Sequence, residues 1–232
     1  MEFQQFDRRN YPTVSARTGY GEWATTYEET VPDHLDIHVL ERIKTVDWPA
    51  ATQCLDLGCG TGRIGAWLRR RGVATIDGLD LTPEMIDRAR AKQLYRALLL
   101  GSVEETGISG VQYDLIVMSL VDEHLSGLER VYWEAYRLSA ADVGAMFVVV
   151  GMHPLFFMTG MPTHFEDSTG NPKAIETHVH LMSEHVSAAL LAGWTLREMY
   201  EGVIDEDWLR VKPKWAHLRH RPVNFGCVWG RK

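Results

Sequence analysis

The sequence is poor in cysteine and has no long apolar run. Its 232 residues contain three cysteines, Cys54, Cys59 and Cys227, whose spacing fits neither a disulfide framework nor a zinc site. No stretch approaches the length of a transmembrane helix, and the opening residues, MEFQQFDRRN, lack the apolar core of a signal peptide. We therefore expect a cytoplasmic protein that does not enter a membrane.

The chain also lacks an excess of positive charge. Its 24 Lys and Arg residues are outnumbered by 31 Asp and Glu residues, which gives a net charge of −7. That balance argues against a general binder of nucleic acid or of anionic membranes. Internal repeats and low-complexity segments are absent as well. We expect one domain, as a monomer or a homodimer.

A glycine-rich stretch, CLDLGCGTG at residues 54–62, stands out from this ordinary background. An apolar strand leads into Asp56, three glycines alternate at Gly58, Gly60 and Gly62, and the apolar period then becomes that of a helix. Glycines let the backbone approach a ligand closely, and the start of a helix offers free N–H groups. The stretch therefore predicts a nucleotide-type site at a strand–helix junction.

Strand and helix patterns alternate through most of the chain. Strands are expected at 52–57, 74–80, 96–100, 113–120 and 144–151, and helices at 33–45, 63–71, 83–95, 128–138 and 177–192. This alternation predicts a doubly wound α/β fold with a mostly parallel sheet. Two closing strands, at 194–201 and 224–230, have no helix between them and predict an antiparallel hairpin at the sheet edge.

Three segments fall outside that alternation. Residues 1–45 predict an N-terminal helical cap, whose first 18 residues are either a mobile arm or an arm that folds over a pocket. Residues 152–176 are too long and too apolar for a plain connection and predict an active-site lid. Residues 203–222, rich in Trp, Lys, His and Arg, are expected to form a loop that is either a second wall of the substrate site or a solvated hairpin loop.

Two classes of cofactor use such a glycine turn. Gly60-x-Gly62-x-x-Gly65 matches the dinucleotide pattern. Asp56, however, would repel a pyrophosphate, whereas it would attract a ligand that carries an ammonium group. The closest glycine triplet, 58/60/62, and the helix-free closing hairpin also favour the second class.

With those features, residues 54–62 resemble motif I of the class I S-adenosylmethionine (AdoMet)-dependent methyltransferases, acid-x-Gly-x-Gly-x-Gly. The resemblance runs from about Gly19 to Lys232, is strongest over 52–125, and includes GYGEWATTYE, which is similar to the first helix of small-molecule methyltransferases. It implies a single methyltransferase domain over residues 1–232 with a Rossmann-like, seven-stranded sheet. It also implies AdoMet as methyl donor, S-adenosylhomocysteine as product, and a small-molecule acceptor methylated on O or N, with C as a further option. The cofactor-binding residues it implies are Tyr20, Tyr27, Asp56, Gly58, Cys59, Gly60, Asp80, Leu81, Met85, Ser102, Val103, Ser119 and Leu120.

Methyl transfer from a sulfonium is an in-line displacement, in which an alcohol or ammonium acceptor must lose a proton. His124 follows the fourth strand and is a candidate base, or a histidine that packs the next turn. His153 and His178 are further catalytic candidates. The neighbouring Asp122 and Glu123 are not expected to share a proton, and at least one of them is expected to be exposed or to cap the turn. The expected substrate contacts are Tyr11, Trp23, Phe156, His164, Trp215 and Arg219.

The histidine-rich stretch HVHLMSEH, at residues 178–185, lacks the i, i+4 spacing of a helical metal pair, so we expect no metal. Two alternatives to methyl transfer stay open. The same site could cleave or cyclise the aminobutyrate arm of AdoMet and release methylthioadenosine, or the protein could bind AdoMet without catalysis.

Overall fold

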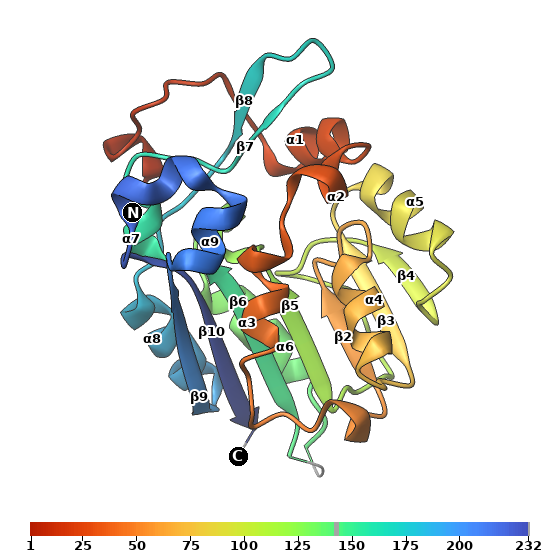
Figure 1. The fold of residues 1–232 in the computed structure, drawn as a ribbon. Coiled ribbons are helices and arrows are strands. Elements are labelled where there is room, and N and C mark those ends of the chain that lie inside the picture. The colour runs from red at the N-terminus through yellow and green to blue at the C-terminus, as the bar shows by residue number, and fades with distance from the viewer. Residues whose placement is uncertain (142–143, 232) are drawn as a thin grey trace.

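A computed structural model describes residues 1–141 and 144–231 of the chain. Its main sheet has seven strands in the order β4-β3-β2-β5-β6-β10-β9 (Figure 1). Strands β2 to β6 run parallel, and β10 lies antiparallel between β6 and β9. The expected mostly parallel sheet with its closing antiparallel hairpin is confirmed. The strands are β2 (Cys54–Leu57), β3 (Ile76–Asp80), β4 (Ala97–Leu100), β5 (Leu115–Ser119), β6 (Met146–Met152), β9 (Trp194–Val203) and β10 (Pro222–Arg231).

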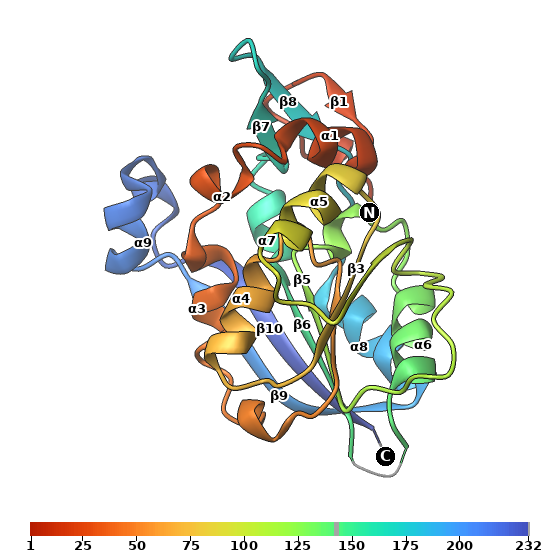
Figure 2. The same ribbon diagram turned by 90° about the vertical axis from the view of Figure 1, so that its right-hand side faces the viewer.

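Helices cover both faces of this sheet, which explains why its central strands are apolar throughout. Helices α3 (Ile37–Leu40) and α4 (Arg63–Arg70) pack on one face, and α6 (Glu129–Leu138) and α8 (Met182–Ala192) pack on the other (Figure 2). Helix α5 (Pro83–Ala91) joins β3 to β4. Trp67, Trp194 and Trp229 are among the large side chains that these two apolar layers bury completely.

Three expected elements differ from the structure. The helix expected at 33–45 divides into a 3-10 turn, Asp33–Leu35, and α3, because Asp36 leaves the helical conformation and its buried carboxylate binds Arg63. The helix expected from residue 177 begins only at Met182. The loop expected at 203–222 contains α9 (Glu206–Val211) and a 3-10 helix, Pro213–Leu218.

Above the carboxyl ends of the parallel strands lies a separate layer (Figures 1 and 2). It holds the N-terminal helices α1 (Ala16–Trp23) and α2 (Tyr27–Thr30), and α7 (Pro154–Phe157). Strands β1 (Thr13–Val14), β8 (Pro172–Ile175) and β7 (His164–Glu166) form a second, three-stranded sheet in which the N-terminal segment pairs with the lid. The N-terminal segment therefore packs against the lid, as expected for the arm that folds over a pocket and not for a mobile arm.

None of the helices within 1–141 and 144–231 combines the length and the apolar character that crossing a membrane requires.

Candidate active site

The glycine turn connects β2 to α4 at the carboxyl edge of the sheet. Gly58 has a φ of 80°, and a Cβ there would lie 2.4 Å from Val121 Cγ2, so a larger residue fits neither the conformation nor the space. The Gly58 and Cys59 N–H groups donate to the Leu79 carbonyl, at 2.8 and 2.9 Å. The turn is thereby fixed to the end of β3, next to Asp80.

Asp80 ends β3 and organises the surroundings of the turn. Its Oδ2 accepts a hydrogen bond from the Gly60 N–H at 2.8 Å, and its Oδ1 accepts one from the Thr82 N–H at 2.9 Å. Burial raises the pKa of this carboxyl above its ordinary value. The carboxylate lines a cavity of about 180 Å³, here called the smaller pocket.

The smaller pocket gathers all of the expected cofactor-binding residues except Asp56 and Cys59. Sequence reasoning did not assign several of its other lining residues, although most of them are chain neighbours of assigned ones and share the same strand ends. The complete lining is Ala16, Tyr20, Tyr27, Gly58, Gly60, Asp80, Leu81, Thr82, Met85, Ser102, Val103, Glu104, Ser119, Leu120, Val121, His124 and Leu125.

Asp56 and Cys59 lie outside both pockets. The Asp56 carboxylate is 1% exposed and accepts a hydrogen bond from the Tyr95 hydroxyl at 2.7 Å. Burial raises the pKa of Asp56 to about 7. The Cys59 side chain packs with Ile86 and Ala89. The Asp56 carboxylate faces Tyr95 beneath the turn, and its expected contact with a ligand's ammonium group stays a prediction.

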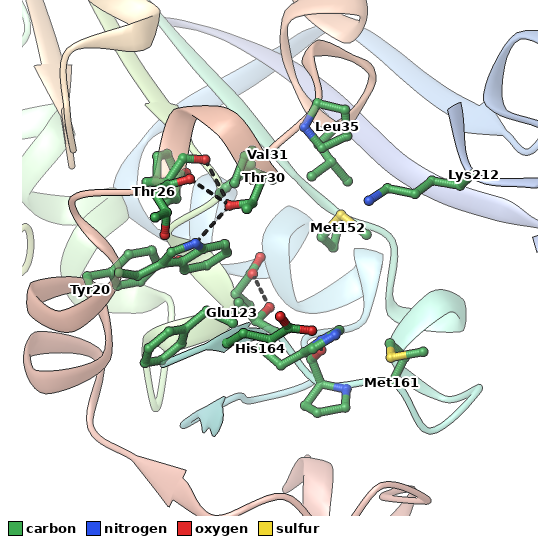
Figure 3. Close-up of a pocket in the computed structure, with 18 of the residues that line it drawn as sticks. Tyr20, Thr26, Thr30, Val31, Leu35, Glu123, Met152, Met161, His164 and Lys212 are labelled. Carbon is green, nitrogen blue, oxygen red and sulfur yellow. Dashed lines mark hydrogen bonds between the residues drawn. The ribbon is translucent and has the colours of Figure 1, made fainter. Parts of the chain in front are cut away.

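A second cavity has a volume of about 560 Å³ and is here called the larger pocket (Figure 3). Tyr20, Tyr27 and Leu120 line both cavities, so the two meet where β5 ends. Leu120 has a φ of 57° there, in the left-handed region that a leucine seldom adopts. The expected substrate residues Trp23, Phe156, His164 and Trp215 line the larger pocket, as do Lys212 and Lys214.

Besides Asp56 and Cys59, four more expected site residues lie outside both pockets. His153 caps α7, with its Nδ1 accepting from the Leu155 N–H and its Nε2 2.8 Å from a Glu201 carboxylate oxygen. His178 precedes α8, with Nδ1 3.5 Å from a Glu2 carboxylate oxygen. Of the expected substrate contacts, Tyr11 packs its ring on His164, and Arg219 is an exposed partner of Glu206. The loop's basic contribution to the larger pocket therefore comes from Lys212 and Lys214.

His124 lines the smaller pocket, and both of its ring nitrogens have partners. Nδ1 lies 2.7 Å from the Glu176 carbonyl, and Nε2 lies 2.8 Å from the Tyr20 hydroxyl. Burial lowers the pKa of His124 to about 4, so the ring is neutral at pH 7. The neutral ring donates from Nδ1 to the carbonyl and accepts from the Tyr20 hydroxyl at Nε2. Nε2, the ring nitrogen that could accept a proton from a substrate, therefore already accepts the hydrogen bond from Tyr20.

Asp122 and Glu123 are both 3% exposed, which rules out the exposed alternative, and the 3-10 turn that contains them has no side-chain cap hydrogen bond. The 3-10 turn Asp122–His124 folds inward beneath the lid and turns the two carboxyls into the protein. Asp122 Oδ2 lies 3.3 Å from His185 Nε2. Glu123 lines the larger pocket, and its Oε1 accepts a hydrogen bond from the Thr163 hydroxyl at 2.7 Å.

Sequence reasoning thus missed Glu123 as a site residue. The available signal was its place directly after a buried parallel strand, because ligands of doubly wound sheets bind at the carboxyl ends of strands. Across the part of the chain that the structure describes, no group of three His, Cys, Asp or Glu residues is placed to hold a metal ion.

Comparison with known proteins identifies this arrangement. Residues 55–143 match the family model described as "Methyltransferase domain". This stretch, which holds the glycine turn and Asp80, is therefore similar to a methyltransferase domain. Over 87 residues it is 38% identical to the malonyl-[acyl-carrier protein] O-methyltransferase of Serratia marcescens, a match that covers 38% of this chain and 34% of that protein. The chain spans about a third of the length of the curated relatives it matches.

Solved structures share the methyltransferase fold over most of the chain. An AdoMet-dependent methyltransferase from Mesorhizobium loti superposes with a TM-score of 0.66 at 18% identity, covering 84% of this chain and 96% of that one. A methyltransferase from Streptomyces caelestis gives a TM-score of 0.64 at 16% identity, covering 92% and 98%.

The match to the methyltransferase family is uneven across the two pockets. Residues 55–143 include the glycine turn, Asp80, Ser102 and the turn with Glu123. The N-terminal cap, the lid and the 203–222 segment, which supply most of the larger pocket, lie outside the matched range. The matched range therefore supplies most of the smaller pocket, whereas most residues of the larger pocket come from outside it.

Proposed function

We propose that this protein is an AdoMet-dependent methyltransferase that methylates O or N of a small-molecule acceptor, with C as a further option, and releases S-adenosylhomocysteine. The observation that carries the proposal is the meeting of the two pockets at Tyr20, Tyr27 and Leu120. A cofactor held in the smaller pocket would face an acceptor held in the larger one. In-line transfer between two bound molecules requires that relation.

The residues of the smaller pocket fit AdoMet. Asp80 presents a buried carboxylate to the pocket, which suits the two hydroxyls of a ribose. Leu81, Met85 and Val103 supply an apolar surface for an adenine, and the glycine turn lets backbone approach the amino-acid arm. Bound AdoMet supplies a methyl group that its positive sulfonium has already activated. The chain's own residues have to orient the acceptor and exclude water.

The larger pocket fits a small acceptor. Its volume of about 560 Å³ falls within the range of small-molecule sites, roughly 300–1,000 Å³. Aromatic and apolar side chains from the cap, the lid and the 203–222 segment form its walls, and Lys212 and Lys214 add positive charge. The relative from Serratia marcescens carries the name of an O-methyltransferase, which makes oxygen one of the acceptor atoms to test here.

Calorimetric titration with S-adenosylhomocysteine tests the cofactor site. Asp80→Ala removes the proposed ribose acceptor, the hydrogen bond from Gly60 of the turn and the hydrogen bond from Thr82, so we expect at least tenfold weaker binding. Asp87→Ala, an exposed aspartate on α5, is the matched control and should bind as wild type. Circular dichroism confirms that both variants are folded. Unchanged affinity in Asp80→Ala would refute the ribose role.

Product analysis separates the reactions. Wild-type protein with AdoMet and an acceptor should yield S-adenosylhomocysteine by chromatography. Release of methylthioadenosine would instead support cleavage or cyclisation of the aminobutyrate arm, and tight binding without turnover over a broad acceptor panel would support a non-catalytic AdoMet-binding protein.

A further inference from the structure

The carboxyl of Glu123 is buried in the larger pocket with one oxygen unused. Oε1 is held by the Thr163 hydroxyl of the lid. Oε2 is buried and has no hydrogen-bond partner within residues 1–141 and 144–231. A buried carboxyl oxygen without a donor is costly, and such groups are rare where no ligand completes them. The free oxygen therefore marks a place where a bound molecule would supply a donor.

Glu123 also lies beside the junction of the two pockets. Its Oε1 is 3.7 Å from His124 Nε2, and His124 lines the smaller pocket. The Tyr20 hydroxyl that binds this same nitrogen belongs to a residue that lines both pockets. An acceptor atom that donates to Glu123 would therefore lie near the end of the smaller pocket that opens toward the larger one.

Besides Glu123, the larger pocket is lined by two lysines, Lys212 and Lys214, and by three acids nearer its rim, Glu29, Glu166 and Asp167. Figure 3 draws Glu123 between Tyr20 on one side and Lys212 on the other. Lys212 is partly exposed and Lys214 is exposed, whereas Glu123 is buried. The pocket thus has a buried acid inside and both lysines and acids toward solvent, with aromatic walls from Trp23, Phe156 and Trp215 among its lining, so an acid group on a ligand would have to lie beside Lys212 and Lys214. This polarity suits an aromatic acceptor with its acid group outward and its hydroxyl inward.

We propose that Glu123 is the catalytic base of this methyltransferase, and that the acceptor is an aromatic hydroxy acid whose hydroxyl donates to Glu123 while its acid group pairs with Lys212 and Lys214. The inference rests on the proposed function. The hydroxyl proton passes to the Glu123 carboxylate as the acceptor oxygen forms a bond to the methyl carbon. The bond from that carbon to sulfur breaks, and its electron pair stays on sulfur. The products are an aryl methyl ether, S-adenosylhomocysteine and a protonated Glu123, which returns its proton to water.

The charged and titratable groups around Glu123 set the pH at which it can act. Asp122 and His124 flank it on its own turn, and Tyr20 and Tyr27 face it from the cap. The lid contributes the neutral Thr163 at Oε1, and it adds His164, Glu166 and Asp167 to the lining of the same pocket. Burial, and then the charge of Asp122, raise the pKa of Glu123 to about 8. Since the base must be ionised, kcat should rise with pH up to about 8 and level off above it.

The contact between Glu123 and the acceptor hydroxyl can be tested by equilibrium binding. The full chain is saturated with S-adenosylhomocysteine and titrated with 4-hydroxyphenylacetate or with phenylacetate, which lacks the hydroxyl. At pH 9 we expect wild type to bind the hydroxylated probe about tenfold tighter, as expected for a hydrogen bond to an ionised carboxylate. At pH 6.5 this preference should fall below about threefold. Glu123→Gln, which keeps the shape but cannot ionise, should show the small preference at both pH values. Glu129→Gln, an exposed glutamate on α6, is the matched control and should behave as wild type.

Turnover of the hydroxylated probe supplies the second readout. We expect the methyl ether by mass spectrometry, and a kcat at least about 100-fold lower in Glu123→Gln, without the rise toward pH 8. Four results would each overturn the inference: no binding of either probe, no hydroxyl preference in wild type, a pH-dependent preference that survives in Glu123→Gln, or a methyl ester as product. Failure of S-adenosylhomocysteine to bind wild type would instead overturn the proposed function.

Discussion

Asp56, buried beneath the glycine turn, predicts how the stability of this protein depends on pH. Its carboxylate is 1% exposed, accepts from the Tyr95 hydroxyl, and has a pKa raised from 3.8 to about 7 by burial. A carboxyl that is harder to ionise in the folded state than in the unfolded chain contributes stability below pH 4, and that contribution is lost as pH rises toward 7. We therefore expect part of the stability of this protein to decline across the neutral range because of Asp56.

The size of the decline follows from the two pKa values. One pKa unit corresponds to about 1.4 kcal/mol, so the full shift is worth roughly 4 kcal/mol. Between pH 5 and pH 8 the part that is lost is about 2.5 kcal/mol. Asp56→Asn cannot titrate but can still accept from Tyr95. The difference in unfolding free energy, variant minus wild type, should therefore rise by about 2.5 kcal/mol from pH 5 to pH 8. A constant offset caused by the substitution itself does not affect this change.

Urea unfolding of wild type and Asp56→Asn at pH 5, 6, 7 and 8 measures this change. Asp87→Asn, an exposed carboxyl on α5, should follow wild type at every pH. Because the Asp56 carboxylate lies outside both pockets, S-adenosylhomocysteine affinity should change by less than about threefold. A constant difference between variant and wild type would refute the reasoning about burial. A large loss of affinity would restore Asp56 as a ligand contact.

The Tyr20–His124 hydrogen bond should behave as one unit: Tyr20→Phe and His124→Gln should each lower the unfolding free energy by about 1 kcal/mol, and the double variant should lose no more than either alone. Additive losses in urea unfolding would show that the two side chains act separately. Gly58→Ala should lower the unfolding free energy by about 2 kcal/mol or more and weaken S-adenosylhomocysteine binding, because a Cβ at φ 80° would lie 2.4 Å from Val121 Cγ2. Wild-type stability and affinity in that variant would show that the turn can adjust.

The sequence was most informative where local pattern decides structure. The apolar run of β5 and the glycine turn after β2 predict the parallel sheet, because buried parallel strands and tight strand–helix turns each have a strong local signature. Asp80 could be placed at the end of its strand for the same reason. These elements position the smaller pocket, and the family match falls on them.

The larger pocket was harder to predict because it depends on contacts between distant segments. Nothing near Glu123 in the sequence shows that Thr163 will cover it, or that the turn will point inward. His153 and His178 were chosen for their residue type and neighbourhood. The structure assigns them to a helix cap and to a contact with Glu2, since tertiary packing determined which way each ring points.

The small sheet above the pockets joins two segments far apart in the sequence. Thr13 and Val14 pair with Ala174 and Ile175 of the lid, and α1 follows directly after this strand. Trp23 of α1 stacks on Phe165 of the lid, with ring centroids 5.6 Å apart. The cap over one pocket and the wall of the other are thus parts of a single body. A displacement of the lid strands would therefore also displace α1, whose Tyr20 lines both pockets.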